Sequence, residues 1–328
     1  MVRNSFLDKA SNTTPAILTR GLRKVYNSSA KGNVEALRSL DIEIPRGSFF
    51  GLLGPNGAGK STFINILAGL VNRTSGSAYI CGYDNIAEMR KARLAIGIVP
   101  QELVLDPFFT AREALDVQAG YYGVRVSERR TTEILEAVGL ADQADAYARS
   151  LSGGMRRRLM VAKALVHSPS VVVLDEPTAG VDVELRKQLW AYLRLINKNG
   201  TTVVLTTHYL EEAEELCDRI AIIDHGELIA LDETDALLAP LDHKELVILV
   251  EDDIESVPEK LKQWDCELLT PRKLIIRYKR SKADISRVLD CLRDSGINIC
   301  DLTTSESDLE DVFLHLTRTA RDNRPFEK

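Results

Sequence analysis

The sequence predicts an α/β protein built around a largely parallel sheet, followed by a small α+β domain. Short β-branched runs such as Val171–Leu174 and Thr201–Thr206 alternate with helical patterns such as Val183–Asn197, which is typical of parallel strands joined by helices. Beyond Ala239 the pattern changes to short strands with fewer helices between them. We therefore expect a loose tail over residues 1–15, a large domain over 16–238 and a small domain over 239–328.

The composition sets limits on function. Of 328 residues, 45% are hydrophobic and 27% are charged, as in ordinary globular domains. The net charge of −6 disfavours a general nucleic-acid binder, which usually carries an excess of positive charge. We expect no signal peptide and no membrane helix, because no apolar run approaches the ~20 residues that such a helix needs. The five cysteines are scattered and contain no C-x-x-C pair, which argues against a zinc or disulfide site.

The first part of the large domain predicts strands that lead into a helix. Two β-like runs, Ala16–Arg20 and Ala36–Ile44, flank a Gly/Ser/Asn-rich loop over Asn27–Asn33. The apolar run Phe49–Leu53 then enters a glycine-rich turn, and a helical pattern follows over Ser61–Leu70. This order indicates a strand, a loop and a helix around the turn.

The remaining elements follow from periodicity and turn signals. Residues 105–170 predict several helices, Tyr209–Cys217 predicts a glutamate-rich helix, and His225-Gly226 between two apolar runs predicts a hairpin. In the small domain we expect the strands Glu245–Val250, Leu274–Tyr278 and Ile297–Leu302, a helix carrying Ile285, Val288, Leu289 and Leu292, and a last helix carrying Leu309, Val312, Phe313 and Leu316, capped by Ser307 and Glu310.

The strongest chemical signal is a glycine-rich loop that matches G-x-x-x-x-G-K-[ST] between a predicted strand and a predicted helix. Glycine lets phosphate oxygens approach the backbone N–H groups closely, and the N-terminus of the helix attracts the anion. Lys60 supplies a cation to the β/γ-phosphate oxygens, and Ser61 offers a hydroxyl to Mg²⁺. The predicted nucleotide-binding residues of this loop are Gly54, Pro55, Asn56, Gly57, Ala58, Gly59, Lys60, Ser61 and Thr62.

Two carboxylates at the end of a buried-type strand predict the partner of this loop. Asp175 ends the run that begins at Val171, and Glu176 follows it. Asp175 suits the Mg²⁺ shell, and Glu176 suits the polarisation of the attacking water. A pair of surface carboxylates would explain the motif equally well in isolation, but the phosphate loop favours the functional interpretation.

A second phosphate-binding feature identifies the class. The pentad Leu151–Met155 places Ser152, Gly153 and Gly154 at the start of a predicted helix, where backbone N–H groups attract anions. Together with the glycine-rich loop, this pentad resembles the signature motif of the ABC (ATP-binding cassette) ATPases. The resemblance implies a P-loop NTPase core with a mixed sheet, an antiparallel β subdomain and a helical subdomain. In that family, two chains sandwich two ATP molecules, each between the P-loop of one chain and the signature of the other.

The resemblance extends over residues 16 to about 235 and implies further roles. Tyr26 matches the aromatic residue that stacks on adenine, and Gln101 matches the glutamine that senses Mg²⁺. Asp182 matches the loop that crosses the dimer interface, and His208 matches the histidine that contacts the γ-phosphate. The implied catalytic set is Lys60, Gln101, Glu176 and His208, and the implied Mg²⁺ set is Ser61, Gln101 and Asp175. The other histidines are interpreted as structural, and Arg156–Arg158 as a solvated helix face with local ion pairs.

Several stretches are similar to the ATPases of ABC-2 type exporters, among them drug-resistance, nodulation-factor and bacterial YadG-like subunits; these stretches are Leu151–Pro169, Asp175–Trp190 and Leu205–Ile220. This likeness implies an ATPase with ATP and Mg²⁺, a second ATPase copy that forms a homodimer, and a separate transmembrane permease. It also implies peripheral attachment to the cytoplasmic face of the inner membrane, with Gln101–Glu113 facing the permease. No nucleic-acid partner is expected.

The main alternative is a non-transport ABC ATPase of the translation or DNA-repair type. Translation factors of this kind carry two cassettes, whereas this sequence has one P-loop. Repair proteins insert long coiled coils between P-loop and signature, and the stretch between Lys60 and Leu151 is too short for one. A P-loop kinase or switch is disfavoured by the signature pentad.

Overall fold

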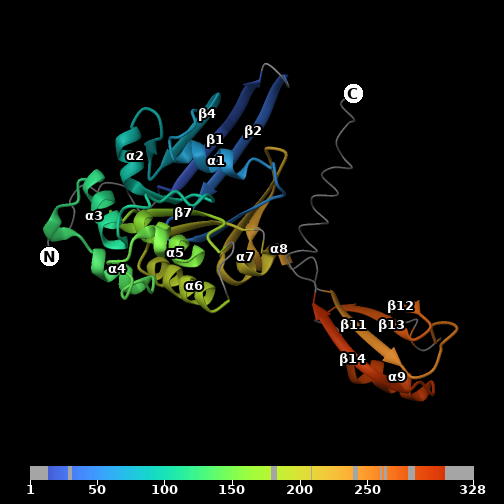
Figure 1. Cartoon of the computed structure of the whole chain (residues 1–328). Helices are drawn as coiled ribbons and strands as arrows, with labels where there is room; N and C mark the ends of the chain where they lie inside the picture. The colour runs from blue at the N-terminus through green and yellow to red at the C-terminus, as the bar shows by residue number, and fades with distance from the viewer. Residues whose placement is uncertain are drawn as a thin grey trace. The chain divides into compact units, whose positions relative to one another are not determined.

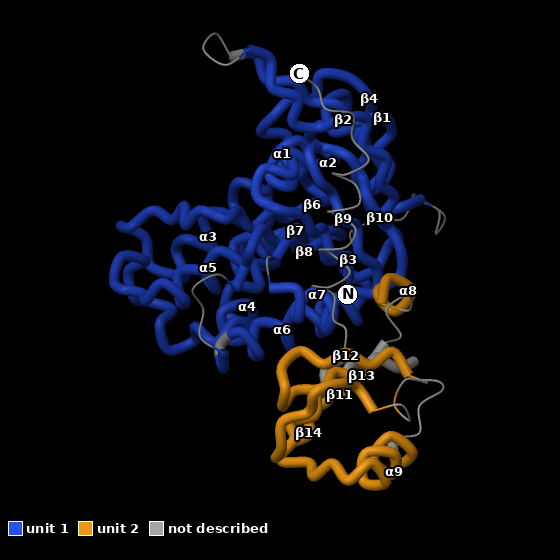
Figure 2. The backbone as a smooth tube through the Cα atoms, turned by 90° about the vertical axis from the view of Figure 1, so that its right-hand side faces the viewer, with its two compact units in different colours: residues 1–233 blue, residues 234–328 orange. Residues whose placement is uncertain are grey.

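A computed structural model of the chain describes residues 14–28, 32–178, 183–207, 209–238, 243–258, 261, 264–279 and 285–306. The chain forms two compact units, residues 1–233 and 234–328 (Figure 2). The predicted tail up to residue 13 and the predicted last helix with its cap lie outside the described residues.

The first unit contains an antiparallel sheet in the order β2-β1-β4-β5. Its strands are β1 (Ile17–Ser28), β2 (Gly32–Ile44), β4 (Ser75–Ile80) and β5 (Tyr83–Asp84). The predicted loop over Asn27–Asn33 was wrong at both ends, because Asn27 pairs with Asn33 and Ser28 with Gly32 in a continuing ladder; residues 29–31 lie outside the described residues. Backbone hydrogen bonds extend this hairpin past the last apolar residues, and side-chain pattern alone does not reveal such pairing.

The second sheet of this unit has six strands in the order β10-β9-β3-β8-β7-β6. Five of them run parallel, and β10 is antiparallel to β9, which confirms the predicted hairpin at His225-Gly226. Every residue of β3, β7 and β8 is buried, as expected for strands covered on both faces. The strands are β3 (Phe49–Leu53), β6 (Ile96–Val99), β7 (Val171–Asp175), β8 (Thr202–Thr206), β9 (Arg219–Asp224) and β10 (Glu227–Glu233).

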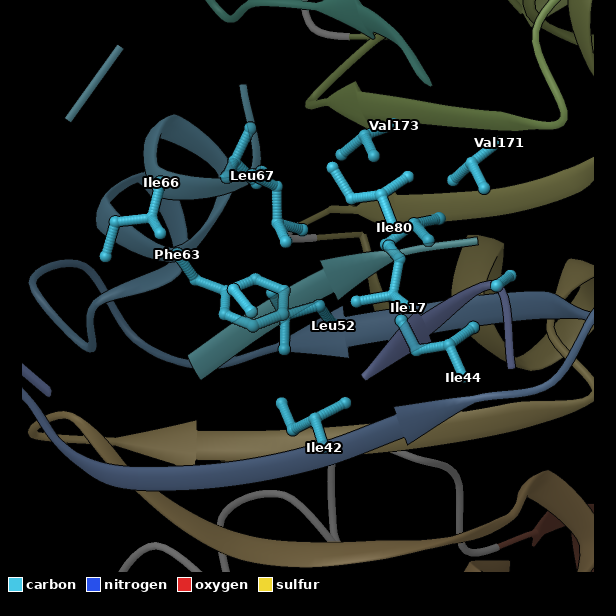
Figure 3. Close-up of a cluster of buried hydrophobic side chains, with 14 of the residues drawn as sticks. Ile17, Ile42, Ile44, Leu52, Phe63, Ile66, Leu67, Ile80, Val171 and Val173 are labelled. Atoms are coloured by element: carbon cyan, nitrogen blue, oxygen red, sulfur yellow. The ribbon is translucent and has the colours of Figure 1, made fainter. Parts of the chain in front are cut away.

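One apolar cluster joins the two sheets through helix α1 (Lys60–Leu67). Figure 3 shows Phe63 of α1 beside Leu52 of β3, with Ile17 of β1 and Val173 of β7 in the same cluster. The residues are fully or almost fully buried. Because α1 is packed in this way, the loop between β3 and α1 has both ends anchored in the core.

Helices α3 (Ala111–Tyr121), α4 (Thr131–Ala137) and α5 (Gly153–Leu165) lie together at one end of the unit and have a core of their own (Figure 1). A capping box of Thr110 and Glu113 starts α3, which satisfies two of its free N–H groups. The helix-rich character predicted for residues 105–170 is confirmed. The other helices of this unit are α2 (Met89–Ala95), α6 (Val183–Lys198) and α7 (Leu210–Leu216), and two 3₁₀ turns lie at Val126–Glu128 and Ala148–Ser150.

The second unit is an α+β domain with an antiparallel sheet in the order β12-β13-β11-β14. Val288 and Leu292 of α9 pack with Leu246 and Ile276 of the sheet. Strand β12 was missed by the sequence analysis, because Thr270 is its one β-branched residue and Asp265 and Glu267 are of types that are depleted in strands. The described elements are α8 (Thr234–Leu238), β11 (His243–Val250), β12 (Asp265–Thr270), β13 (Lys273–Lys279), α9 (Ile285–Asp294) and β14 (Ile299–Glu306).

Candidate functional site

The carboxyl ends of the parallel strands bring the predicted phosphate and metal residues together. The P-loop follows β3, Asp175 ends β7 and Thr206 ends β8, and these three strands are neighbours. Parallel strands end at the same edge of a sheet, where ligands bind in open α/β folds. A hollow of about 170 Å³ lies here, lined by Ala36, Asn56, Gly57, Ala58, Gly59, Lys60, Ser61, Thr62, Gln101, Asp175 and Glu176.

Two glycines of the P-loop are required by their surroundings. A Cβ on Gly54 would lie 2.3 Å from the carbonyl oxygen of Ile223 in β9. Gly59 has a φ of 108°, and a Cβ there would lie 2.6 Å from the carbonyl oxygen of Ala36 in β2. Any side chain at either position would push the loop away from the strands that support it. The loop is therefore packed tightly between β9 and β2.

Lys60 is buried at the start of α1 and is held by the loop itself. Its ammonium donates to the carbonyl oxygens of Gly54 and Pro55, the latter at 3.1 Å. Burial lowers the pKa of Lys60, and the negative charges of Glu176 and Asp175 partly oppose this. Lys60 also lines the hollow, beside Asp175 and Glu176.

Oxygen ligands suited to Mg²⁺ meet at the end of β7. The Ser61 hydroxyl donates to Asp175 Oδ2 at 3.4 Å, and the Thr206 hydroxyl donates to Asp175 Oδ1 at 2.5 Å. Within the described residues no group of three or more His, Cys, Asp or Glu side chains could hold a metal alone. Magnesium commonly takes one or two protein oxygens together with substrate phosphates and water, and a hydroxyl beside a buried carboxylate fits this requirement.

Glu176 is fixed by its backbone as well as by its side chain. Its φ of 50° lies in the left-handed region, which costs a non-glycine residue about 1–3 kcal/mol. Its N–H donates to the carbonyl oxygen of Thr206 at 3.1 Å, and the Gln101 amide donates to its carboxylate at 3.1 Å. Strain of this kind commonly marks functional positions. The sequence analysis missed Thr206, which donates to the Asp175 carboxylate and accepts from the backbone N–H of Glu176. It is signalled only by its place at the end of a neighbouring strand.

The signature residues lie outside this hollow. Ser152 caps α5 by accepting from the Met155 N–H at 3.2 Å, so that its own hydroxyl proton stays available for a ligand. Ser152 and Gly153 are exposed, and neither is among the residues that line the hollow. Of the described residues, one chain therefore brings Lys60, Gln101, Asp175 and Glu176 together and leaves its signature facing outward.

The interpretation of Arg156–Arg158 as a solvated face was wrong for two of the three residues. Arg157 and Arg158 are only 6% and 4% exposed. Arg157 donates to the carbonyl oxygens of Pro100 and Gln101, and Arg158 donates to those of Val138 and Gly139. The burial of Arg158 could have been predicted from helical spacing. Arg158 precedes the apolar Ala162 by four residues, so the two lie on the same face of the helix.

A buried glutamate on α7 joins two segments that end beside predicted site residues, and it was also missed. Glu212 is 1% exposed and accepts hydrogen bonds from the hydroxyls of Thr178 at 2.6 Å and Thr207 at 2.9 Å. Arg186 of α6 lies 3.5 Å from the same carboxylate. Along the sequence, Thr178 directly precedes residues 179–182, which include the predicted Asp182, and Thr207 directly precedes the predicted His208. The helical spacing that puts Glu212 beside the buried Ala213 and Leu216 could have indicated it.

Three of the predicted residues remain to be placed. Tyr26 is on β1, the residue is 38% exposed, and the Lys24 ammonium lies 4.7 Å from the ring centre. Tyr26 pairs with Val34, two residues before the Ala36 that lines the hollow, so an aromatic surface is available near the P-loop. Asp182 and His208 lie outside the described residues.

None of the helices formed by the described residues combines the length and hydrophobicity that crossing a bilayer requires.

Comparison with known proteins gives relatives along nearly the whole chain. Residues 37–179 match the family model described as ABC transporter. The chain is 36% identical to Nod factor export ATP-binding protein I of Ralstonia nicotianae, over 94% of this chain and 96% of that protein. It is 38% identical to linearmycin resistance ATP-binding protein LnrL of Bacillus subtilis, over 89% of this chain and 97% of that protein.

A solved structure is similar to the first unit. It is the dimeric ATP-binding cassette MJ0796 in a post-hydrolysis state bound to ADP and Pi, with a TM-score of 0.62 and 29% identity over 66% of this chain and 98% of that one.

Proposed function

Since the chain belongs to the ABC transporter family, we propose that two copies of it close around ATP and thereby drive a separate membrane permease that exports a substrate. The chain is an ATP-binding and ATP-hydrolysing cassette of the kind that serves exporters. The proposal concerns the residues that perform each step, the partner and the membrane face.

The observation that carries the proposal is that one chain holds only one side of an ATP site. Lys60, Asp175 and Glu176 line the hollow at the sheet edge, whereas Ser152 and Gly153 are exposed outside it. A helix start with free N–H groups is a ready anion site, and a second copy would place its own at the open side of the hollow. The relative MJ0796 cassette is dimeric with ADP and Pi bound, which supports this arrangement.

In this proposal the nucleotide is held by groups from both copies. Lys60 and the backbone from Gly54 to Thr62 bind the β- and γ-phosphates, and Tyr26 stacks on the adenine. Ser152, Gly153 and Gly154 of the second copy bind the γ-phosphate from the other side, and Asp182 lies at the interface between the copies.

Hydrolysis is assigned to the carboxylates at the end of β7. Ser61, Asp175 and Gln101 would hold Mg²⁺, which would neutralise charge on the phosphate oxygens. Glu176 accepts a proton from the attacking water or orients it, because the Gln101 amide donates to its carboxylate and its backbone N–H donates to the carbonyl oxygen of Thr206. His208 contacts the γ-phosphate. ATP binds the closed dimer better than the open one, and loss of the γ-phosphate contacts reopens it.

An exposed apolar segment is proposed as the docking surface for the permease. Between β6 and α3, the side chains of Leu103, Val104, Phe108 and Phe109 are exposed, Phe108 to 72%. Adjacent exposed apolar side chains commonly mark interaction sites. The segment begins directly after Gln101, so a permease bound here would contact the loop that reaches Glu176. We place the chain as a peripheral subunit on the cytoplasmic face of the inner membrane.

Purification of the tagged full chain from detergent-solubilised membranes tests the proposal. A hydrophobic permease should copurify and should stimulate ATP hydrolysis. Phe108→Ser should abolish copurification and leave the ATPase activity of the isolated chain unchanged. Leu195→Ser, which changes an exposed apolar residue of α6, should have no effect on either. Copurification of ribosomal or DNA-repair proteins instead of a permease would overturn the transport role.

A further inference from the structure

Arg157 joins the signature helix to the loop that carries Gln101. It is the fifth residue of α5, about one helical turn after Gly153. One of its terminal nitrogens donates to the carbonyl oxygen of Pro100 at 3.0 Å and to that of Gln101 at 2.7 Å. The Gln101 amide in turn donates to Glu176 at 3.1 Å. A short path of direct contacts therefore runs from the start of α5 to the hydrolytic carboxylate.

We propose that Arg157 is a positioning residue that transmits displacement of the signature end of α5 to the Gln101–Glu176 pair of the same chain. The inference rests on the proposed function, because it is the γ-phosphate in the other site that would displace the signature. Arg157 then makes hydrolysis in one site depend on occupation of the other.

The surroundings of Arg157 make it suited to this role. Arg157 is 6% exposed, and one of its terminal nitrogens donates to the carbonyl oxygens of Pro100 and Gln101. Its Nε has no hydrogen-bond partner among the described residues. A buried guanidinium that is satisfied mainly by two adjacent carbonyl oxygens must move with them, because breaking these bonds would leave a buried charge without partners.

The electrostatic environment points to the same link. Burial lowers the pKa of Arg157, and the charges of Glu176 and Asp175 oppose this lowering. The anionic groups that act on Arg157 most strongly are thus those of the hydrolytic site. A shift of α5 therefore changes the hydrogen bonds that Arg157 donates to the backbone of Gln101. It also changes the electrostatic effect of the Arg157 guanidinium on the Glu176 carboxylate.

Arg158 provides a matched control on the same helix. It is equally buried, and one of its terminal nitrogens also donates to two consecutive carbonyl oxygens, those of Val138 and Gly139, both at 2.8 Å. These carbonyls follow α4, within the helical end of the unit. Loss of Arg158 should therefore lower stability without breaking the link to Gln101.

The experiment compares Arg157→Met, Arg157→Lys and Arg158→Met in the purified full chain, with ATP hydrolysis measured across Mg-ATP concentrations. Arg157→Met should lower kcat about tenfold, the equivalent of about 1.4 kcal/mol, and bring the Hill coefficient close to one. The affinity for a fluorescent ATP analogue should change little. Arg157→Lys should restore much of the cooperativity, because an ammonium can still donate to both carbonyls. Arg158→Met should lower the melting temperature and keep the cooperativity.

The outcomes separate the two proposals. If the wild type hydrolyses ATP cooperatively and Arg157→Met has the same Hill coefficient, the coupling role of Arg157 is overturned and the dimeric site is not. The same holds if Arg157→Met and Arg158→Met differ only in melting temperature. A wild-type chain that hydrolyses ATP without cooperativity and stays monomeric in Mg-ATP contradicts the dimeric site, and the coupling role with it. If Arg157→Met does not fold, Arg157→Gln takes its place in the comparison, and Arg157→Lys remains the variant expected to retain much of the cooperativity.

Discussion

Replacing Glu176 by glutamine removes one negative charge from the site and keeps the shape of the side chain. The hydrogen bonds from its backbone N–H to Thr206 do not depend on the charge. The carboxylate oxygen that accepts from Gln101 has an amide counterpart that can still accept. The left-handed φ of 50° is unaffected, since both residues have the same branching at Cβ. Folding and ATP binding should therefore be retained.

The expected loss lies in the chemical step. An amide cannot take a proton from water, and removal of a positioned general base typically slows a reaction 10²–10⁴-fold. This factor corresponds to about 3–5 kcal/mol of activation free energy. Since the γ-phosphate then stays intact, the ATP-bound dimer should accumulate, whereas the wild type should cycle back to monomers.

Single-turnover hydrolysis and light scattering after size exclusion, each in Mg-ATP and in Mg-ADP, check this prediction. Glu102→Gln is the matched control, because it removes the same charge from an exposed neighbour of Gln101. The reasoning fails if Glu176→Gln hydrolyses ATP at a rate close to that of the wild type, or if it is monomeric in Mg-ATP while the wild type dimerises.

Three further substitutions test the packing around the site. Gly54→Ala places a Cβ 2.3 Å from the Ile223 carbonyl oxygen. It should cost about 1–3 kcal/mol of unfolding free energy and weaken ATP binding, as thermal unfolding and nucleotide titration can measure. In the control Gly120→Ala the new Cβ lies at an ordinary 3.6 Å from Arg129, and this variant should be neutral or stabilising. Glu212→Gln removes the charge that accepts from Thr178 and Thr207 and should cost about 1–3 kcal/mol, whereas the exposed Glu211→Gln should not; equal denaturation midpoints for these two variants would contradict the bridging role. Burial lowers the pKa of His167 to about 4, so that below about pH 6.5 the unfolded chain binds a proton that the folded chain resists, and stability is lost as pH falls from 6.5 to 4 by up to about 3 kcal/mol. His167→Phe retains a ring to stack on Tyr122 and should flatten this part of the pH profile in urea unfolding, and an unchanged slope would count against the assignment.

Contiguous motifs account for most of what could be predicted. The P-loop, the carboxylate pair after Val171–Leu174 and the hairpin at His225-Gly226 each depend on neighbouring residues. Their conformation is governed by glycine freedom, strand burial and turn chemistry. Predictions that depended on which strands pair with one another were less successful, as with the Asn27–Asn33 ladder and strand β12.

The sequence by itself determined the chemistry of this protein, because a glycine-rich loop ending in Lys60 and Ser61 and a strand ending in Asp175 carry their function in a local pattern. Only the tertiary structure decided how those parts are held together. It placed Thr206 against Asp175, buried Glu212 between Thr178 and Thr207, and turned Arg157 inward onto the Gln101 loop. Such contacts join residues that are far apart along the chain, and their formation depends on strand order and helix packing, which local periodicity does not specify.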